Sequence, residues 1–81
     1  MFYFYILKST SKGTYYKGSC NDVPERLQRH NSGLVRSTKS GMPWSLVYQE
    51  AFGTLSEARK REKQIKSWKK REAIERLIKH F

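Results

Sequence analysis

The chain has 81 residues, enough for one domain but too few for a second domain or a large cofactor cavity. Lysine and arginine number 17 against 7 acidic residues, and the net charge of +10 favours a polyanionic partner, above all nucleic acid. A single cysteine, Cys20, excludes an internal disulfide and a cysteine-rich zinc site, and we expect it to fill apolar space.

The amino-terminal segment predicts a β-hairpin. Residues 2–8 are aromatic and aliphatic without helical spacing, which is typical of a strand buried on both faces. Residues 15–20 predict the returning strand, after a polar loop. Side chains alternate between the two faces of a strand. On the first strand, Tyr3, Tyr5 and Leu7 are therefore expected on one face, and Phe4 and Ile6 on the other. On the returning strand, Tyr16 and Gly18 are expected to share a face.

A helix is predicted next. Asp22 or its neighbour can cap it, and Pro24 suits its first turn. Gly33 is the expected stop. The residues that helical spacing places on or beside its apolar stripe are Val23, Leu27, Leu34, His30 and Arg26.

The middle of the chain predicts a polar, basic loop over residues 35–43 and a third strand over residues 44–52. Simple alternation along this strand places Leu46, Tyr48 and Glu50 together on one face.

The carboxyl-terminal third predicts two helices. Residues 54–57 form a capping box that opens a helix running to about Trp68, and a last amphipathic stretch closes the domain. Its expected apolar side consists of Ile74, Leu77, Ile78 and Phe81. The whole order predicts an α+β fold, β-β-α-β-α-α, with a three-stranded, mainly antiparallel sheet and a single domain over residues 1–81.

Five segments of the chain resemble the GIY-YIG nuclease domain, which occurs in phage intron homing endonucleases and at the amino end of the bacterial excision-repair nuclease. The similarity covers nearly the whole chain and is strongest to the small single-domain members. The segments are YFYIL at 3–7, YKG at 16–18, RLQRHNSG at 26–33, PWSLVY at 43–48 and REKQIKSW at 61–68.

Three positions depart from the family pattern. Tyr3 stands for the first motif's glycine, and Lys17 for the second motif's isoleucine. Ser19 occupies a position where some relatives have a lysine. We expect Lys17 to leave its side of the sheet partly hydrated, and Gly18 to mark a place where backbone must approach closely.

The resemblance implies hydrolysis of a phosphodiester bond with one divalent ion, Mg²⁺ or Mn²⁺, bound by Glu62. Magnesium often needs only one or two protein carboxylates, and Glu62 is the only acidic residue on the apolar stripe of its helix. An ion pair between Glu62 and Arg26 is the alternative expected from the residues alone. The implied catalytic residues are Tyr5, Tyr16, Arg26, His30 and Glu62.

Each remaining role has a plain structural alternative. Arg26 would hold a phosphate oxygen, or be an ordinary surface arginine. Tyr5 and Tyr16 would orient or deprotonate the attacking water, or be core aromatics with satisfied hydroxyls. His30 would relay a proton or hold a phosphate, or lie at the border of its helix.

Cations outside this group are expected to contact phosphates without reading sequence. They are Arg36, Lys39, Lys60, Lys63, Lys66, Lys69, Lys70 and Arg71. Trp44 and Trp68 are expected in the core rather than stacked on bases.

The leading interpretation is a metal-dependent endonuclease of low sequence specificity. We expect it to be cytoplasmic and monomeric. Its substrate would be nucleic acid, DNA more than RNA, in repair or recombination. No membrane segment is expected, and a partner protein would supply targeting. A non-catalytic nucleic-acid-binding protein with the same fold is the alternative, and a basic scaffold on a ribosome or acidic protein is a third.

Overall fold

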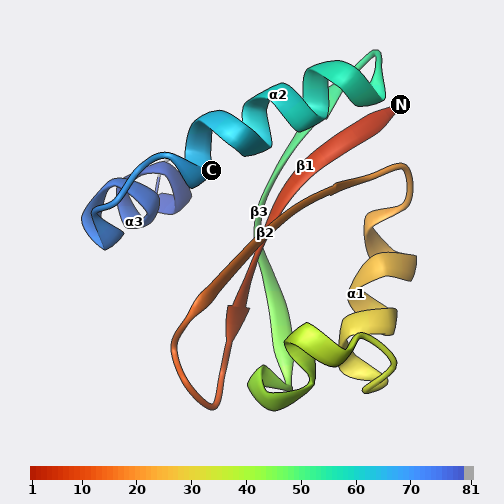
Figure 1. Cartoon of the computed structure of the whole chain (residues 1–81), viewed down its shortest axis with the longest axis vertical. Helices are drawn as coiled ribbons and strands as arrows, with labels where there is room; N and C mark the ends of the chain where they lie inside the picture. The colour runs from red at the N-terminus through yellow and green to blue at the C-terminus, as the bar shows by residue number, and fades with distance from the viewer. Residues whose placement is uncertain (80–81) are drawn as a thin grey trace.

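A three-stranded antiparallel sheet with helices on both faces forms the structure, a computed structural model that describes residues 1–79 (Figure 1). The strands lie in the order β2-β1-β3, so β1 is central and β2 is an outer strand. This arrangement confirms the predicted α+β class and element order. The elements are β1 (Phe2–Ser9), β2 (Tyr15–Cys20), α1 (Val23–Asn31), the 3-10 helix η1 (Arg36–Gly41), β3 (Trp44–Phe52), α2 (Leu55–Lys66) and α3 (Arg71–Lys79).

The central strand β1 is buried on both faces, as its composition predicts. Phe4 and Ile6 contribute to one core cluster, and Tyr5 and Leu7 to another. Each of these four side chains is at most 1% exposed. Because successive side chains of a strand point to opposite faces, β1 serves two cores at once.

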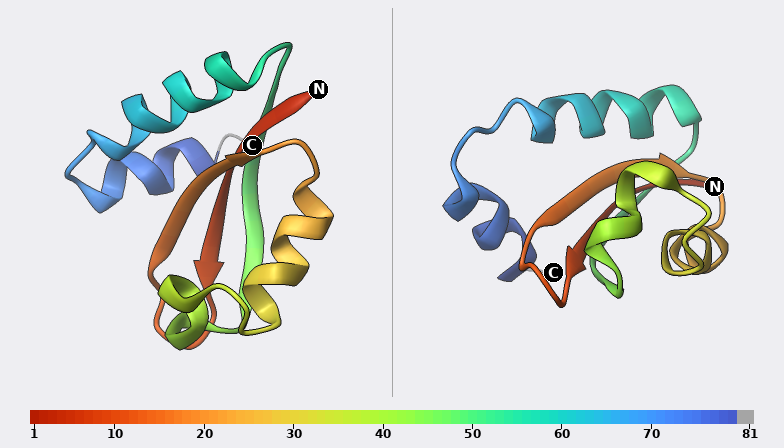
Figure 2. Two further views of the ribbon diagram at one scale, coloured as in Figure 1. Left: turned by 45° about the vertical axis from the view of Figure 1, so that its right-hand side comes forward. Right: turned by 60° about the horizontal axis from the view of Figure 1, so that its bottom comes forward.

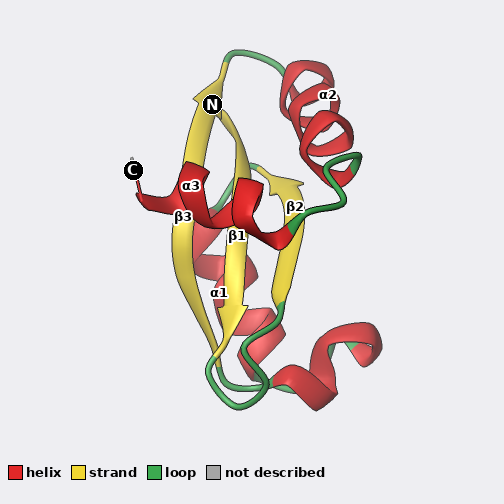
Figure 3. Cartoon of the chain, turned by 90° about the vertical axis from the view of Figure 1, so that its left-hand side faces the viewer, coloured by secondary structure: helices red, strands yellow, loops and turns green. Residues whose placement is uncertain are grey.

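Helices cover both faces of the sheet. The first cluster includes Ile65 of α2 and Ile74 of α3, and we call this side the α2 face. The second includes Val23 of α1 and Trp44, and we call this side the α1 face. In the right-hand view of Figure 2, α1 and α2 lie on opposite sides of the strands, and Figure 3 shows α3 in front of the sheet with α1 behind it.

A capping hydrogen bond explains where α1 begins, and a glycine explains where it ends. Asp22 Oδ1 accepts a hydrogen bond from the Glu25 backbone N–H at 3.1 Å, which makes Asp22 the N-cap. Gly33 adopts a φ of +81°, a left-handed conformation that favours glycine and turns the chain away from the helix. Leu34 is therefore 78% exposed, so its predicted place on the apolar stripe is wrong.

The segment predicted as a loop over residues 35–43 contains the helix η1. Asn31, at the end of α1, fixes the start of the following strand: its side chain donates to the Trp44 carbonyl at 2.9 Å and accepts from the Trp44 N–H at 2.6 Å. The Trp44 indole N–H donates to the Thr38 carbonyl of η1 at 2.8 Å. These side-chain contacts hold η1 against α1, and no local sequence pattern predicts them.

A bulge in β3 overturns the predicted alternation of that strand. Ile6 pairs with Tyr48, but Leu7 pairs with Leu46, which leaves Val47 as an extra residue. Leu46 consequently packs on the α1 face and Tyr48 on the α2 face, instead of sharing one.

The helix α3 packs by its apolar side, as predicted. Ile74 is buried, and Leu77 and Ile78 are partly buried against the same cluster. The fourth predicted residue, Phe81, lies outside the described residues. Within residues 1–79, no helix has both the length and the apolar character needed to cross a membrane.

Of the predicted capping box of α2, the Thr54 N-cap is present, while Glu57 Oε1 accepts from the Thr54 hydroxyl at 3.0 Å instead of from the Thr54 backbone N–H. Thr54 Oγ1 accepts a hydrogen bond from the Glu57 backbone N–H at 3.2 Å. We expect Thr54→Ala to lower the free energy of unfolding by about 1 kcal/mol, because one helix N–H loses its partner. The measurement is urea denaturation, with Ser56→Ala in the same first turn as the matched control. Equal stability of the two variants would contradict the capping role.

Candidate active site

The hairpin brings the Tyr5 phenol directly over Gly18. These residues are opposite each other in the β1–β2 register, so their side chains share the α1 face. A Cβ built on Gly18 would lie 2.6 Å from the Tyr5 hydroxyl oxygen and 3.2 Å from the Tyr16 ring. The expected close approach of backbone at Gly18 is confirmed, and the group it accommodates is the Tyr5 phenol.

A buried hydrogen-bond chain begins at Tyr5. The Tyr5 hydroxyl lies 3.2 Å from His30 Nε2, and His30 Nδ1 lies 2.8 Å from Thr38 Oγ1. The Thr38 hydroxyl proton is directed to the Val35 carbonyl at 3.3 Å. Thr38 Oγ1 must then accept from His30 Nδ1–H, which leaves Nε2 as the acceptor for the Tyr5 hydroxyl. We assign the proton of neutral His30 to Nδ1 on this basis.

The electrostatics of the site agree with this assignment. Burial lowers the pKa of His30 below its ordinary value, and the charges of Arg26 and Arg29 lower it further, so the ring is neutral at pH 7. Burial also raises the pKa of Tyr5 well above its ordinary value, with Tyr16 and Cys20 adding to the effect and Arg26 opposing it. Tyr5 therefore keeps its proton and can donate it.

Arg26 lies at the edge of this chain with an unused donor. Its charge is close enough to act on the pKa of Tyr5, Cys20 and His30. The side chain is half-buried, and its buried Nε has no hydrogen-bond partner among the described residues. An unpaired donor of this kind is costly in a folded protein, so its retention favours an anion-binding role.

Tyr16 packs against the same group but is less buried. Its ring centre lies 4.7 Å from that of His30 and 6.3 Å from that of Tyr5. Tyr5 and His30 are each 1% exposed, whereas Tyr16 is half-buried. Of the four residues gathered here, Tyr16 and Arg26 are the two that can reach a ligand. His30 is fully buried rather than at the helix border.

Glu62 lies on the α2 face, opposite the other four predicted residues. Its Oε1 accepts from the Ser19 hydroxyl at 2.6 Å, and its Oε2 lies 2.5 Å from Lys66 Nζ. The alternative ion pair with Arg26 is not formed, and Lys66, one turn away on α2, pairs with Glu62 instead. The Glu62 side chain is 20% exposed, so solvent reaches it.

The end of β2 joins the two parts of the site. Ser19 and Cys20 are consecutive, so they point to opposite faces of the strand. Ser19 contacts Glu62 on the α2 face, and Cys20 lies near Arg26 on the α1 face. Because β2 is an outer strand, a ligand at its free edge can meet both parts.

The donors around Glu62 fit a hard divalent ion. A carboxylate and a hydroxyl oxygen lie together there, and Mg²⁺ prefers oxygen ligands and completes its shell with water. Within residues 1–79 there is no group of three or more His, Cys, Asp or Glu side chains that could hold a metal. This excludes a zinc-type cage from the described residues.

The eight predicted phosphate-contacting cations are exposed but do not form one patch. Arg36 and Lys39 lie on η1 beside α1, away from α2 (Figure 1). Lys66 is in the ion pair with Glu62. The remaining five lie on α2 or at the start of α3 and the segment before it: Lys60, Lys63, Lys69, Lys70 and Arg71.

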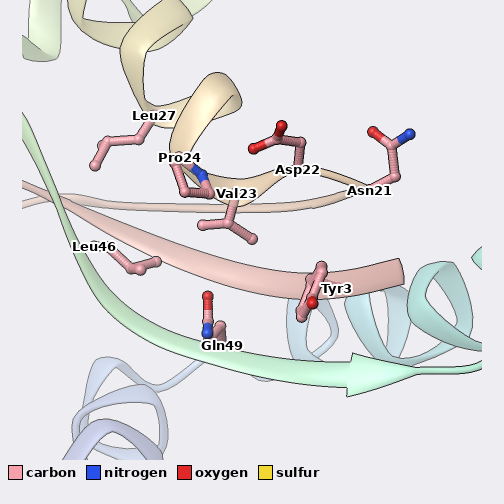
Figure 4. A pocket seen from close by; sticks show the side chains of 8 residues that line it. All are labelled: Tyr3, Asn21, Asp22, Val23, Pro24, Leu27, Leu46 and Gln49. Carbon is pink, nitrogen blue, oxygen red and sulfur yellow. The ribbon is translucent and has the colours of Figure 1, made fainter. Parts of the chain in front are cut away.

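A separate cleft of about 430 Å³ lies between the start of α1 and the sheet. Figure 4 shows Tyr3 and Gln49 from the strands opposite Val23 and Leu27 from α1. None of the five predicted catalytic residues lines it, and its surface is mostly apolar. We therefore place the candidate site at the end of β2 rather than in this cleft.

Sequence reasoning missed two residues of the site, Thr38 and Ser19. Thr38 was part of a segment expected to be a basic loop, and only the packing of η1 on α1 brings it to His30. Ser19 stands in the sequence only as a departure from a position where some relatives have a lysine. A signal was present in strand alternation, which places Ser19 on the face opposite Gly18.

Comparison with known proteins gives consistent matches. The family model of the GIY-YIG catalytic domain matches residues 1–76. A UPF0213 protein of Staphylococcus aureus is 45% identical over 76 residues, covering 93% of this chain and 90% of the relative. A UPF0213 protein of Staphylococcus saprophyticus is 41% identical over 73 residues, covering 89% and 88%.

A solved structure also matches. The solution NMR structure of a UPF0213 protein from Bacillus halodurans superposes with a TM-score of 0.60 at 33% identity, covering 98% of this chain and 84% of that one. The shared fold extends over essentially the whole chain.

The Tyr5–Gly18 contact predicts that Gly18→Ala is destabilising. The new methyl group would overlap the buried Tyr5 hydroxyl, and overpacking of this kind costs about 1–3 kcal/mol. Gly53→Ala is the matched control, since a Cβ there meets nothing closer than 3.6 Å. Chemical denaturation measures both variants, and a Gly18→Ala protein as stable as the control would contradict the geometry.

The buried neutral His30 predicts a pH dependence of stability. Below its ordinary pKa of 6.5, the unfolded chain takes up a proton at this ring that the folded chain resists. Stability contributed by neutral His30 is therefore complete above pH 6.5 and lost as pH falls below it. We expect His30→Gln to reduce this dependence, while His80 is unchanged in both proteins. NMR titration of the folded wild type checks the cause, because a His30 pKa at or above 6.5 would contradict it.

Proposed function

Because the chain belongs to the GIY-YIG catalytic domain family, a family of endonucleases, we propose that residues 1–81 form one domain that hydrolyses phosphodiester bonds in nucleic acid, DNA first. The observation that carries the proposal is the unpaired buried donor of Arg26 beside the Tyr5–His30 chain. A phosphate is an anion that such a guanidinium binds well.

Arg26 is proposed to hold a non-bridging oxygen of the scissile phosphate. The side chain is half-buried, so part of its hydration is already removed before the phosphate arrives. Charge grows on the phosphate oxygens in the transition state, and a fixed cation stabilises that charge. Removal of one such donor typically costs about 100-fold or more in rate.

Tyr16 is proposed to orient the attacking water. Its hydroxyl forms no hydrogen bond to another group within residues 1–79, and its half-buried ring leaves it the accessible tyrosine of the pair. Its oxygen can accept a hydrogen bond from a water molecule at the phosphate.

Tyr5 and His30 are proposed as positioning residues. Both are too buried to meet the substrate, and both hold their neighbours through defined contacts. The Tyr5 phenol supports Arg26, and the His30 ring supports the ring of Tyr16. Thr38 fixes the His30 proton on Nδ1 and so belongs to the same support.

Glu62 and Ser19 are proposed to hold Mg²⁺ or Mn²⁺, in place of the Lys66 ammonium that now neutralises the carboxylate. When bound, the ion would supply positive charge to the phosphate and to the leaving oxygen. The substrate strand would cross the free edge of β2, between Arg26 on one face and Glu62 on the other.

Low sequence specificity is part of the proposal. The cations on the described surface suit contacts to phosphates, which carry no sequence information. Targeting would then come from a partner protein, in a setting such as DNA repair or recombination in the cytoplasm.

Divalent-ion-dependent cleavage tests this function. The substrates are labelled single-stranded, duplex, flap and branched DNA, together with RNA, each with Mg²⁺ or Mn²⁺. We expect Arg26→Ala to lower the rate about 100-fold or more and Glu62→Gln to abolish ion-dependent cutting. Exposed residues on the same helices provide matched controls, Arg29→Ala and Glu57→Gln.

The outcomes separate the alternatives. Binding without cutting, across all ions and substrates, would favour the non-catalytic nucleic-acid-binding protein. Undiminished cutting by Glu62→Gln would overturn the assignment of the ion to Glu62. Little affinity for any naked nucleic acid at moderate salt would favour the basic scaffold.

A further inference from the structure

A second feature of the α2 face is a groove of about 230 Å³ between β2 and the segment that joins α2 to α3. Its floor and walls include two aromatic residues and four cations. The lining residues that matter here are Tyr15, Trp68, Lys17, Lys69, Lys70 and Arg71.

The groove is strongly positive. No acidic residue lines it, and within residues 1–79 the ammonium groups of Lys17, Lys69 and Lys70 form no ion pair. Glu75 of α3, which does not line the groove, pairs with Arg71 at 3.4 Å and accepts a hydrogen bond from the Tyr15 hydroxyl at 3.3 Å, so it neutralises Arg71 but not the three lysines. Three unpaired cations around a small groove repel one another. A bound polyanion would remove that repulsion.

Helix electrostatics add to this potential. Lys69, Lys70 and Arg71 are consecutive and lie at the amino-terminal end of α3. Backbone N–H groups make that end of a helix positive, so cations there lower stability. The placement opposes folding but favours binding of an anion.

Flat side chains lie beside the charges. The Arg71 guanidinium stacks on the Tyr15 ring, 4.9 Å from its centre. The half-buried Trp68 packs against the α2-face cluster, as expected, and also forms part of the groove wall. Aromatic rings and guanidinium planes are the surfaces on which unpaired bases stack, whereas bases in a duplex are already stacked on each other.

The groove lies near the Glu62 part of the candidate site, along β2. Lys17 and Ser19 are two residues apart on β2, so they share the α2 face and are about 7 Å apart along the strand. Ser19 contacts Glu62. Lys17 therefore places a cation on this face, next to the site.

We propose that this groove binds an unpaired nucleic-acid strand that flanks the scissile phosphate, with Lys17, Lys69 and Lys70 on its phosphates and Tyr15, Arg71 and Trp68 against its bases. The inference rests on the proposed function for the position of the cut, but the binding itself does not require cutting. The preferred substrate is then a strand with a single-stranded segment, such as a flap, rather than a continuous duplex.

Fluorescence anisotropy without divalent ions tests the groove apart from catalysis. The probes are a labelled single-stranded DNA, the RNA of the same sequence, the matching duplex, and an abasic single strand. We expect tighter binding to the single strands than to the duplex or the abasic strand. Lys17→Ile and Lys70→Ala should each lower the salt slope on single strands by about 0.7, the amount for one phosphate contact.

Variants of the ring test stacking. Tyr15→Leu should weaken single-strand binding about fivefold or more, whereas Tyr15→Phe, which keeps the ring, should bind like the wild type. Lys79→Ala is the charge-matched control, since Lys79 is exposed on α3 and does not line the groove. Thermal unfolding of each variant identifies any that are not folded, and Lys70, being exposed, is expected to be replaceable without loss of fold.

The results separate this inference from the function. Duplex binding as tight as single-strand binding, or equal salt slopes for Lys70→Ala and Lys79→Ala, would overturn the groove even if the protein cuts DNA. Single-strand binding that needs Lys70 and the Tyr15 ring would support the groove even if no substrate is cut. DNA and RNA single strands bound equally would show that the groove recognises phosphates and bases but not the sugar.

Discussion

Burial of β1 on both faces is the constraint on which the rest of the structure depends. Four consecutive side chains, Phe4 to Leu7, are almost entirely withdrawn from water. A strand with two apolar faces needs cover on both, so the chain places α1 and η1 on one side and α2 and α3 on the other. The same strand carries Tyr5, so the candidate site shares the rigidity of the core.

This two-sided architecture also divides the candidate site. The Tyr5, His30 and Arg26 group belongs to one face, whereas Glu62 belongs to the other, and only the outer strand β2 lies between them. Gly18 has a central role because its missing side chain admits the Tyr5 phenol. One residue further, Ser19 turns to Glu62, so two positions of one strand serve two different faces.

Unpaired positive charge is likewise found on both faces of the sheet. The net charge of +10 opposes a compact fold, and the described residues contain four ion pairs. Several cations instead remain unpaired, above all near the start of α3, and Arg26 keeps an unused buried donor. A polyanion at the edge of β2 would neutralise both regions at once.

The sequence by itself determined the elements, their order and the two-faced central strand, because periodicity and capping act over a few residues. Its resemblance to the GIY-YIG domain also implied the functional candidates, which are Tyr5, Tyr16, Arg26, His30 and Glu62. Only tertiary structure decided the bulge at Val47, the helix η1 and the contact of Thr38 with His30, since each depends on packing between distant segments. It also decided that Glu62 pairs with Ser19 and Lys66 rather than with Arg26, because the sheet itself separates those two side chains.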